Sequence, residues 1–217
     1  MTIEPEKGAR EDVKERILTS AIGVFLSQGR LGARIQHIAE NAQVNKALVY
    51  YYFKNRTELY RQALRWQLQT MFEELWTELS PMDDVDHNSV ALLKHFMRAH
   101  FRVVSRNRDR TRFIVGAAAD EPNLVRSVVR QLADSGQPEV LRELLAAIER
   151  GVSSGQLRSI NPKQLVISML GMNMFFFVAR PIAETFLDLN IEDEELFLEE
   201  RLTSVLDSML YGVIERR

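Results

Sequence analysis

Apolar residues recur at helical spacing along almost the whole 217-residue chain, and this pattern restricts the possible folds more than any other feature. Near the N-terminus, one face of a predicted helix carries Val13, Ile17, Ala21, Val24 and Phe25. Glycine and proline are scarce, with 10 and 6 copies, and no segment shows the alternation of a half-buried strand. The sequence therefore predicts an all-α protein.

The first ~55 residues predict one helix followed by two short helices. The first helix should end at Gly29, because glycine readily adopts the left-handed conformation that follows a helix. The second helix has apolar residues at i, i+3, i+4 and i+7, namely Ile35, Ile38, Ala39 and Ala42. After a break at residues 43–45, a third helix should run from Lys46 to about Phe53, with Asn45 as its N-cap. This order predicts a helix-turn-helix arrangement.

The remaining residues predict helices at 57–79, 88–104, 111–119, 123–133, 138–153, 162–180 and 192–214. Around the junction of the helices predicted at 88–104 and 111–119, residues 102–112 carry five arginines and one aspartate. We expect a solvated inter-helix loop there. The alternatives are attraction of an anionic ligand and contact with the neighbours of the basic domain.

Composition narrows the class of protein further. The chain has no cysteine, which excludes disulfides and thiolate metal sites, and no pattern of histidines and carboxylates predicts a metal site. It has no run of about 18 uncharged apolar residues and no apolar leader at its start. The longest apolar segment, 165–179, is interpreted as a buried or interface helix. We expect a cytoplasmic protein with no cofactor and no membrane partner.

Charge is distributed unevenly along the chain. Up to Arg65 there are 11 Lys/Arg and 7 Asp/Glu, a balance of +4, whereas the rest has 17 and 23, a balance of −6, and the two sum to the net charge of −2. A basic N-terminal part and an acidic remainder indicate that the two parts have different tasks.

The helical phase of residues 46–54 separates a buried side from an exposed side. At about 100° per residue, Val49 and Phe53 share the face toward the core. The opposite face carries Lys46, Ala47, Tyr50, Tyr51 and Lys54, with Tyr52 at the flank. An exposed basic and aromatic helix face is suited to the major groove of double-stranded DNA, where lysines reach phosphates or guanine edges and phenols donate to phosphates.

The stretch IQHIAENAQVNKALVYYYFKNRTEL resembles the helix-turn-helix of the TetR family of bacterial repressors. The matching residues are Ile38, Ala39, Ala42, Val44, Tyr50, Phe53 and Leu59, with Phe25 and Gly29 ahead of them. The resemblance implies a disordered tail at 1–11, a DNA-binding domain at 12–60 with its motif at about 34–53, and a helical effector-binding and dimerisation domain at 61–217. Gln43 stands where the family usually has glycine, and Tyr52 where histidine is common.

By this resemblance, specific side chains would contact an operator. Gln36 and Lys46 would read base edges, with Ala47 and Tyr51 beside them and Asn45 capping the helix. The phosphate contacts would come from Arg34, Tyr50, Tyr52, Lys54 and Arg56. A solvated surface residue is the alternative for each of them.

The resemblance also implies a homodimer and a small apolar or amphipathic effector. We expect the last two long helices to form the dimer interface, through Leu165, Leu198, Leu202, Val205, Met209 and Val213. The candidate effector-binding residues are Trp66, Met97, Phe101, Phe113, Met169, Met172, Asn173 and Phe176. Packing in the protein's own core is the alternative for both sets.

The resulting hypothesis is a ligand-responsive transcriptional regulator, most simply a homodimeric repressor released from a pseudo-palindromic operator by its effector. One alternative is an all-α enzyme, for which the sequence offers no glycine-rich phosphate loop and no paired carboxylates, so we expect no enzyme. The other is a DNA-binding scaffold or activator that needs no effector.

Overall fold

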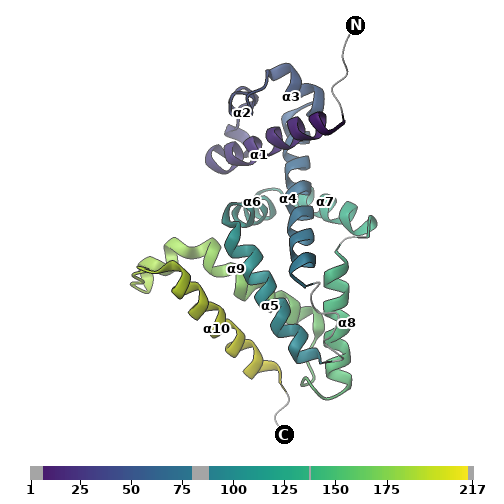
Figure 1. The fold of residues 1–217 in the computed structure, drawn as a ribbon, viewed down its shortest axis with the longest axis vertical. Helices are drawn as coiled ribbons and strands as arrows, with labels where there is room; N and C mark the ends of the chain where they lie inside the picture. Colours follow the sequence, from purple (N-terminus) through teal and green to yellow (C-terminus); the bar gives the residue numbers. More distant parts are fainter. Residues whose placement is uncertain (1–6, 80–87, 137, 215–217) are drawn as a thin grey trace. The chain divides into compact units, whose positions relative to one another are not determined.

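The computed structural model describes residues 7–79, 88–136 and 138–214, and these residues form ten α-helices (Figure 1). The predicted all-α class is confirmed. Of the predicted tail, residues 1–6 lie outside the described residues, as does the segment 80–87 between the helices predicted at 57–79 and 88–104. Helix α1 already begins at Lys7, inside the range expected to be tail.

The chain packs into two compact units, Met1–Gln69 with Arg112–Leu132, and Thr70–Thr111 with Ala133–Arg217. Helix α4 (Arg56–Leu79) divides after Gln69 and contributes to both units. Residues 112–132 belong to the first unit. The predicted domain boundary between residues 60 and 61 placed them in the second domain instead.

The first unit contains α1 (Lys7–Gly32), α2 (Ile35–Asn41) and α3 (Lys46–Phe53), the first part of α4, and most of α6 (Arg108–Asp120) and α7 (Pro122–Asp134). Gly29 has φ 68, so regular helix geometry is interrupted at the residue predicted to end the first helix. In the core, the Tyr60 ring lies edge-on to Phe25 at 4.8 Å between centroids and to Phe113 at 5.3 Å. These aromatic contacts join α1, α4 and α6.

The second unit contains α5 (Ser89–Arg106), α8 (Glu139–Ser153), α9 (Pro162–Phe186) and α10 (Glu194–Val213). Helix α5 packs against α8, α9 and α10. Its apolar face, with Leu93, Phe96 and Met97 buried, forms the centre of the main core. A smaller cluster contains Phe101, Val104, Phe176 and Phe177.

Helix α9 is apolar nearly all round. Among the described residues it is the one helix long and apolar enough to cross a membrane, with a mean hydropathy of 1.7 over its most apolar window, of which 39% is buried. One face packs against α5, α8 and α10, and the helix bends at Ala179, just before Pro181. The apolar composition of α9 therefore fits a second explanation besides a membrane span. One face of the helix packs in the core, and a second apolar face is exposed.

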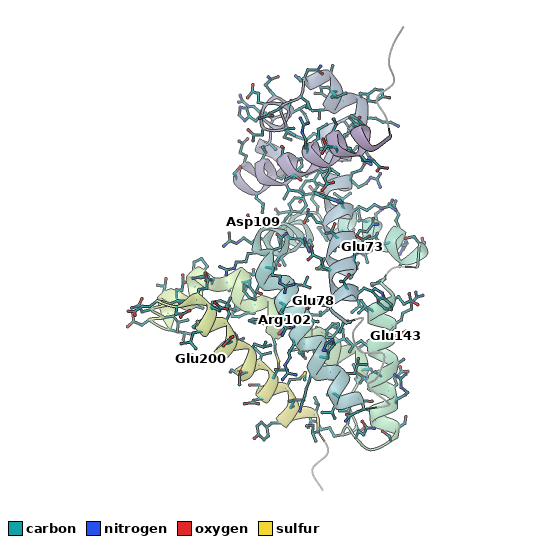
Figure 2. The ribbon with its side chains drawn as sticks, viewed as in Figure 1. Glu73, Glu78, Arg102, Asp109, Glu143 and Glu200 are labelled. Atoms are coloured by element: carbon teal, nitrogen blue, oxygen red, sulfur yellow. The ribbon has the colours of Figure 1, made fainter. Side chains whose placement is uncertain are left out.

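The arginine-rich segment 102–112 is mostly helical, which corrects the expectation of a loop. Only Asn107 separates α5 from α6. Arg102, labelled beside Glu78 in Figure 2, pairs with that carboxylate, and so does Arg106. The buried Arg110 makes two hydrogen bonds of 2.6 and 2.7 Å with Glu74. These arginines stabilise the second unit by tying α5 and α6 to α4.

Candidate DNA-binding interface

The turn between α2 and α3 is held by its own backbone and by one arginine. Gln43 has φ 54, a left-handed conformation that residues with a Cβ atom rarely adopt. The Val44 N–H donates to the carbonyl of Ala39 at 2.9 Å, which closes the end of α2. The Arg16 guanidinium on α1 donates to the carbonyl oxygens of Ala42 at 2.6 Å and Gln43 at 3.4 Å. Sequence reasoning missed Arg16, because no local pattern reveals a contact across 26 residues.

Helix α3 begins as predicted. The Asn45 side chain accepts a hydrogen bond of 2.8 Å from the Leu48 N–H, so it caps the first turn. Asn55 does the same for α4 by accepting from the Glu58 N–H at 2.9 Å. The two asparagine caps fix where α3 and α4 begin.

The predicted helical phase of α3 is confirmed. Val49 and Phe53 are 1% and 0% exposed, whereas Tyr50 and Tyr51 are 43% and 71% exposed. The other outward residues, Lys46, Ala47 and Lys54, are exposed as well, and Tyr52 is half-buried. The two buried residues anchor the helix, and the rest of its surface is presented to solvent.

The exposed side of α3 is basic and aromatic. The Lys46 ammonium lies 5.8 Å from the centroid of the Tyr50 ring, and the Tyr51 and Tyr52 rings meet edge to face at 5.3 Å. Within the described part of the chain, Arg34, Lys46 and Lys54 have no ion-pair partner. A surface with unpaired cations and phenol hydroxyls can bind a polyanion.

Three predicted DNA-contact residues outside α3 differ in whether their side chains are free to contact DNA. Arg34 is exposed and makes no capping hydrogen bond at the start of α2. The Gln36 amide donates to the Glu40 carboxylate at 2.8 Å and is exposed. Arg56 instead donates to the backbone carbonyls of Leu31 at 2.7 Å and Ala33 at 3.2 Å. Its guanidinium therefore braces the link between α1 and α2.

The predicted effector residues do not form one group. Trp66 and Phe113 belong to the first unit. The others lie on α5 and α9 of the second unit, where Met97, Phe101, Met169, Asn173 and Phe176 are buried and Met172 is half-buried. Six of the eight predicted residues therefore come from two helices that pack against each other.

The polar member of this group, Asn173, is fully buried. Its amide N–H groups donate to the Met97 carbonyl at 3.0 Å and to Nδ1 of His100 at 3.1 Å. Among the described residues, its Oδ1 has no hydrogen-bond partner. Burial lowers the pKa of His100 to about 4, so this imidazole is neutral at pH 7 and can accept from Asn173. An unpaired buried oxygen costs about 1–3 kcal/mol, which makes Asn173 notable.

The predicted dimer residues need a correction. Leu165, Val205, Met209 and Val213 are buried in the core of their own unit, and Leu198 and Leu202 are half-buried against it. The exposed face of α9 carries instead the apolar stripe of Ile167, Phe175, Val178, Ile182 and Phe186. On a helix that is apolar all round, periodicity could not tell which face is covered.

Comparisons with known proteins agree with this geometry. Residues 17–63 match the family model of bacterial regulatory proteins of the tetR family. Over 206 residues, 94% of this chain and 91% of the relative, the chain is 26% identical to the transcriptional regulator RutR of Escherichia coli. A 54-residue stretch, 25% of this chain and 28% of the relative, is 43% identical to the transcriptional repressor SCO4008 of Streptomyces coelicolor.

The fold also matches a solved structure, that of the transcriptional regulator PfmR from Thermus thermophilus. The TM-score is 0.65 at 21% identity, over 93% of this chain and 100% of PfmR. The helix-turn-helix, its family model and relatives that span nearly the whole chain lead to one conclusion. The helix-turn-helix of this chain is that of the TetR family of bacterial transcriptional regulators, and the chain is similar to such a regulator over nearly its whole length.

Proposed function

We propose that this regulator is a homodimeric, cytoplasmic repressor that binds a pseudo-palindromic DNA operator through α3 and leaves it when a small effector binds. The observation that carries the proposal is the exposed face of α3, which presents Lys46, Tyr50, Tyr51 and Lys54 together with the small side chain of Ala47. A helix face that combines cations and phenols with a small residue in its first turn can approach base edges in a major groove.

We assign base contacts to Gln36 and Lys46, with Ala47 and Tyr51 beside them. Arg34, Tyr50, Tyr52 and Lys54 would bind phosphates and set the register of the helix on the duplex. Arg56 has a supporting role, because it holds two carbonyls next to α2. The acceptor Glu40 would orient the Gln36 amide toward the DNA.

The apolar stripe of α9 is the surface that we assign to the second copy of the chain. A short recognition helix reads only a few base pairs, so helix-turn-helix proteins gain specificity by reading two half-sites as dimers. Phe175 and Phe186 are 64% and 84% exposed, and such large apolar side chains favour burial against a partner. Leu196 and Tyr211 on α10 are exposed as well and would extend the interface.

The effector would bind between α5 and α9 next to Asn173. The sulfurs of Met97, Met169 and Met172 can repack around different apolar bodies. An effector with a hydrogen-bond donor would satisfy the unpaired Oδ1 of Asn173. The protein would release the operator if the effector binds more tightly to a conformation in which the two α3 helices of the dimer have a different spacing. Such coupling between effector binding and DNA binding is commonly worth about 1–3 kcal/mol.

Fluorescence anisotropy with DNA from the protein's own promoter region, against random duplex of the same length, tests DNA recognition. We expect specific binding to be stronger at moderate salt, and both affinities to fall as salt is raised. Equal affinity for the promoter DNA and the random duplex at every salt concentration would contradict the proposal.

A further inference from the structure

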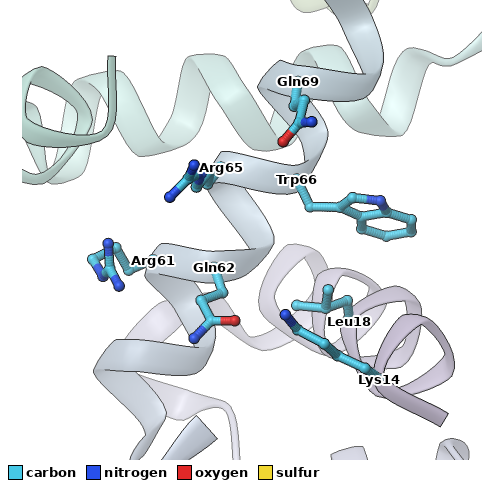
Figure 3. A pocket seen from close by; sticks show the side chains of 7 residues that line it. All are labelled: Lys14, Leu18, Arg61, Gln62, Arg65, Trp66 and Gln69. Carbon is cyan, nitrogen blue, oxygen red and sulfur yellow. The ribbon is translucent and has the colours of Figure 1, made fainter. Parts of the chain in front are cut away.

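The first unit contains a cleft that is separate from the α3 surface and from the residues between α5 and α9. It lies between α1 and α4 and has a volume of about 390 Å³ (Figure 3). Helix α1 contributes Lys14 and Leu18, and α4 contributes Arg61, Arg65 and Trp66 together with two glutamines. This volume is within the range of about 300–1,000 Å³ that is usual for small-molecule sites.

The lining of the cleft is cationic. Three of its seven residues are Lys or Arg, and none is Asp or Glu. Arg61 is already neutralised by Glu58, with N–O distances of 2.6 and 2.8 Å, and it also donates to Gln131. In the part of the chain that the structure describes, Lys14 and Arg65 have no carboxylate partner. Two positive charges therefore face the cleft without compensation.

The other part of the lining is flat and apolar. Trp66 is half-buried, and Figure 3 shows its indole extending from α4 on the side of the helix that faces Leu18. Leu18 is 5% exposed, so its side chain forms a fixed apolar floor rather than a mobile one. The Gln62 amide donates to Glu58 at 2.7 Å, and this hydrogen bond fixes the amide beside the cleft. The lining thus combines an aromatic plane, an apolar floor and unpaired cations.

We propose that this cleft binds a small aromatic carboxylate or phosphate ester, with its ring on Trp66 and Leu18 and its anionic group at Lys14 and Arg65. A guanidinium matches a carboxylate or phosphate with parallel hydrogen bonds, and a lysine adds a point charge. The ring would cover apolar surface that solvent now reaches. The site rests on its own lining, so it does not depend on the proposed operator or on the effector between α5 and α9.

The emission of Trp66 gives a direct measurement. The chain has two tryptophans, so the full-length Trp76→Phe variant leaves Trp66 as the only indole. Benzoate and phenyl phosphate are the probes, with benzyl alcohol as the uncharged ring and inorganic phosphate as the anion without a ring. We expect saturable changes in emission with the two aromatic anions, and at least tenfold weaker apparent binding of the two control compounds.

Charge variants test the assignment of the anionic group. Lys14→Gln with Arg65→Gln should weaken binding of benzoate and phenyl phosphate at least tenfold. Arg130→Gln, which removes an exposed arginine of the same unit outside the cleft, should leave it unchanged. Both replaced cations are exposed, and thermal melts followed by circular dichroism check that the variants fold. In the unaltered protein, added chloride should weaken binding.

Three results would overturn the proposal. One is the absence of saturable emission changes, and another is equal binding by the Lys14→Gln/Arg65→Gln variant. The third is displacement of the probes by random duplex DNA, together with uniformly weaker DNA binding by the same variant, because the cleft would then hold a DNA phosphate. Loss of operator recognition alone affects none of these readouts, so failure of the proposed function remains distinguishable.

Discussion

Gln43 shows how a single residue can depart from the preferred chemistry of a turn and still keep its conformation. Its φ of 54 is strained for a residue with a Cβ atom, at a cost of roughly 1–2 kcal/mol. The two hydrogen bonds from Arg16 and the backbone bond from Val44 keep the turn in place.

We expect Gln43→Gly to stabilise the protein by about 0.5 kcal/mol, because relief of strain exceeds the entropy that glycine adds to the unfolded chain. Urea unfolding measures the difference. Gln43→Ala is the matched control and should bring no gain, since alanine keeps the Cβ atom. A lower stability for Gln43→Gly than for Gln43→Ala would contradict this interpretation of the turn.

Lys46 and Phe53 test the two sides of α3. Phe53→Ala should cost about 3–5 kcal/mol in unfolding free energy, because Phe53 is 0% exposed. Lys46→Ala should leave unfolding within about 0.5 kcal/mol of the parent and weaken binding to specific DNA. Urea unfolding and anisotropy measure the two effects. Equal losses of folding stability in both variants would show that the phase of α3 is misassigned.

For individual residues, the sequence predicted those features that depend on residues nearby in the chain. The Asn45 cap and the burial of Val49 and Phe53 follow from spacing and side-chain chemistry. Arg56 could not be predicted in the same way. Its partners are carbonyls 25 and 23 residues earlier, and only the packed structure brings them into reach.

At the scale of elements, α9 is the least predictable helix, because apolar residues surround it. Leu165 and Met169 face the core, whereas Ile167 and Phe175 are exposed to solvent. The sequence predicted that this helix has a role in burial or at an interface. Which face has which role depends on the packing of α5, α8 and α10 against it.

Phe175→Glu should dissociate the proposed dimer, since a carboxylate would be buried without a partner at the interface. Sedimentation velocity at micromolar concentration should show a monomer, and operator binding should weaken with it. Val129→Glu is the control, because Val129 is also an exposed apolar residue but lies on α7. An unchanged sedimentation profile for Phe175→Glu would contradict the assignment of the dimer interface to α9.

The buried pair of Asn173 and His100 links α5 to α9 and predicts a pH dependence. The folded pKa of His100 is about 4, below the unfolded value of about 6.5, so the unfolded chain binds the proton more readily. The contribution of the neutral His100 to the free energy of unfolding is full above the unfolded pKa of about 6.5. It decreases as the pH falls from there toward the folded pKa of about 4. The loss from this group between pH 7 and pH 5 should be about 2 kcal/mol.

Urea unfolding at the two pH values measures this loss. His100→Gln does not titrate and can still accept from Asn173, so its stability should change less over the same interval. His37→Gln, which replaces a histidine of the other unit, should behave like the parent. The same pH dependence in the parent and in His100→Gln would contradict a buried neutral imidazole.

For the whole molecule, the sequence predicted the fold class and the helix-turn-helix, because both depend on periodicity and capping. It did not predict how distant segments assemble. Trp66 and Phe113 were grouped with Met97 and Phe176 by composition, yet they lie in a different unit. The contacts that set Phe113 beside Phe25 and Tyr60 join residues far apart in the chain.

The central claim is that two copies of α3 read one operator. Hydroxyl-radical footprinting of the protein on its own promoter DNA tests it most directly. We predict two protected half-sites on one face of the duplex, about one helical turn or a multiple of it apart, and their joint loss with Lys46→Ala. A single protected patch, or two patches that persist in the Lys46→Ala variant, would contradict the account.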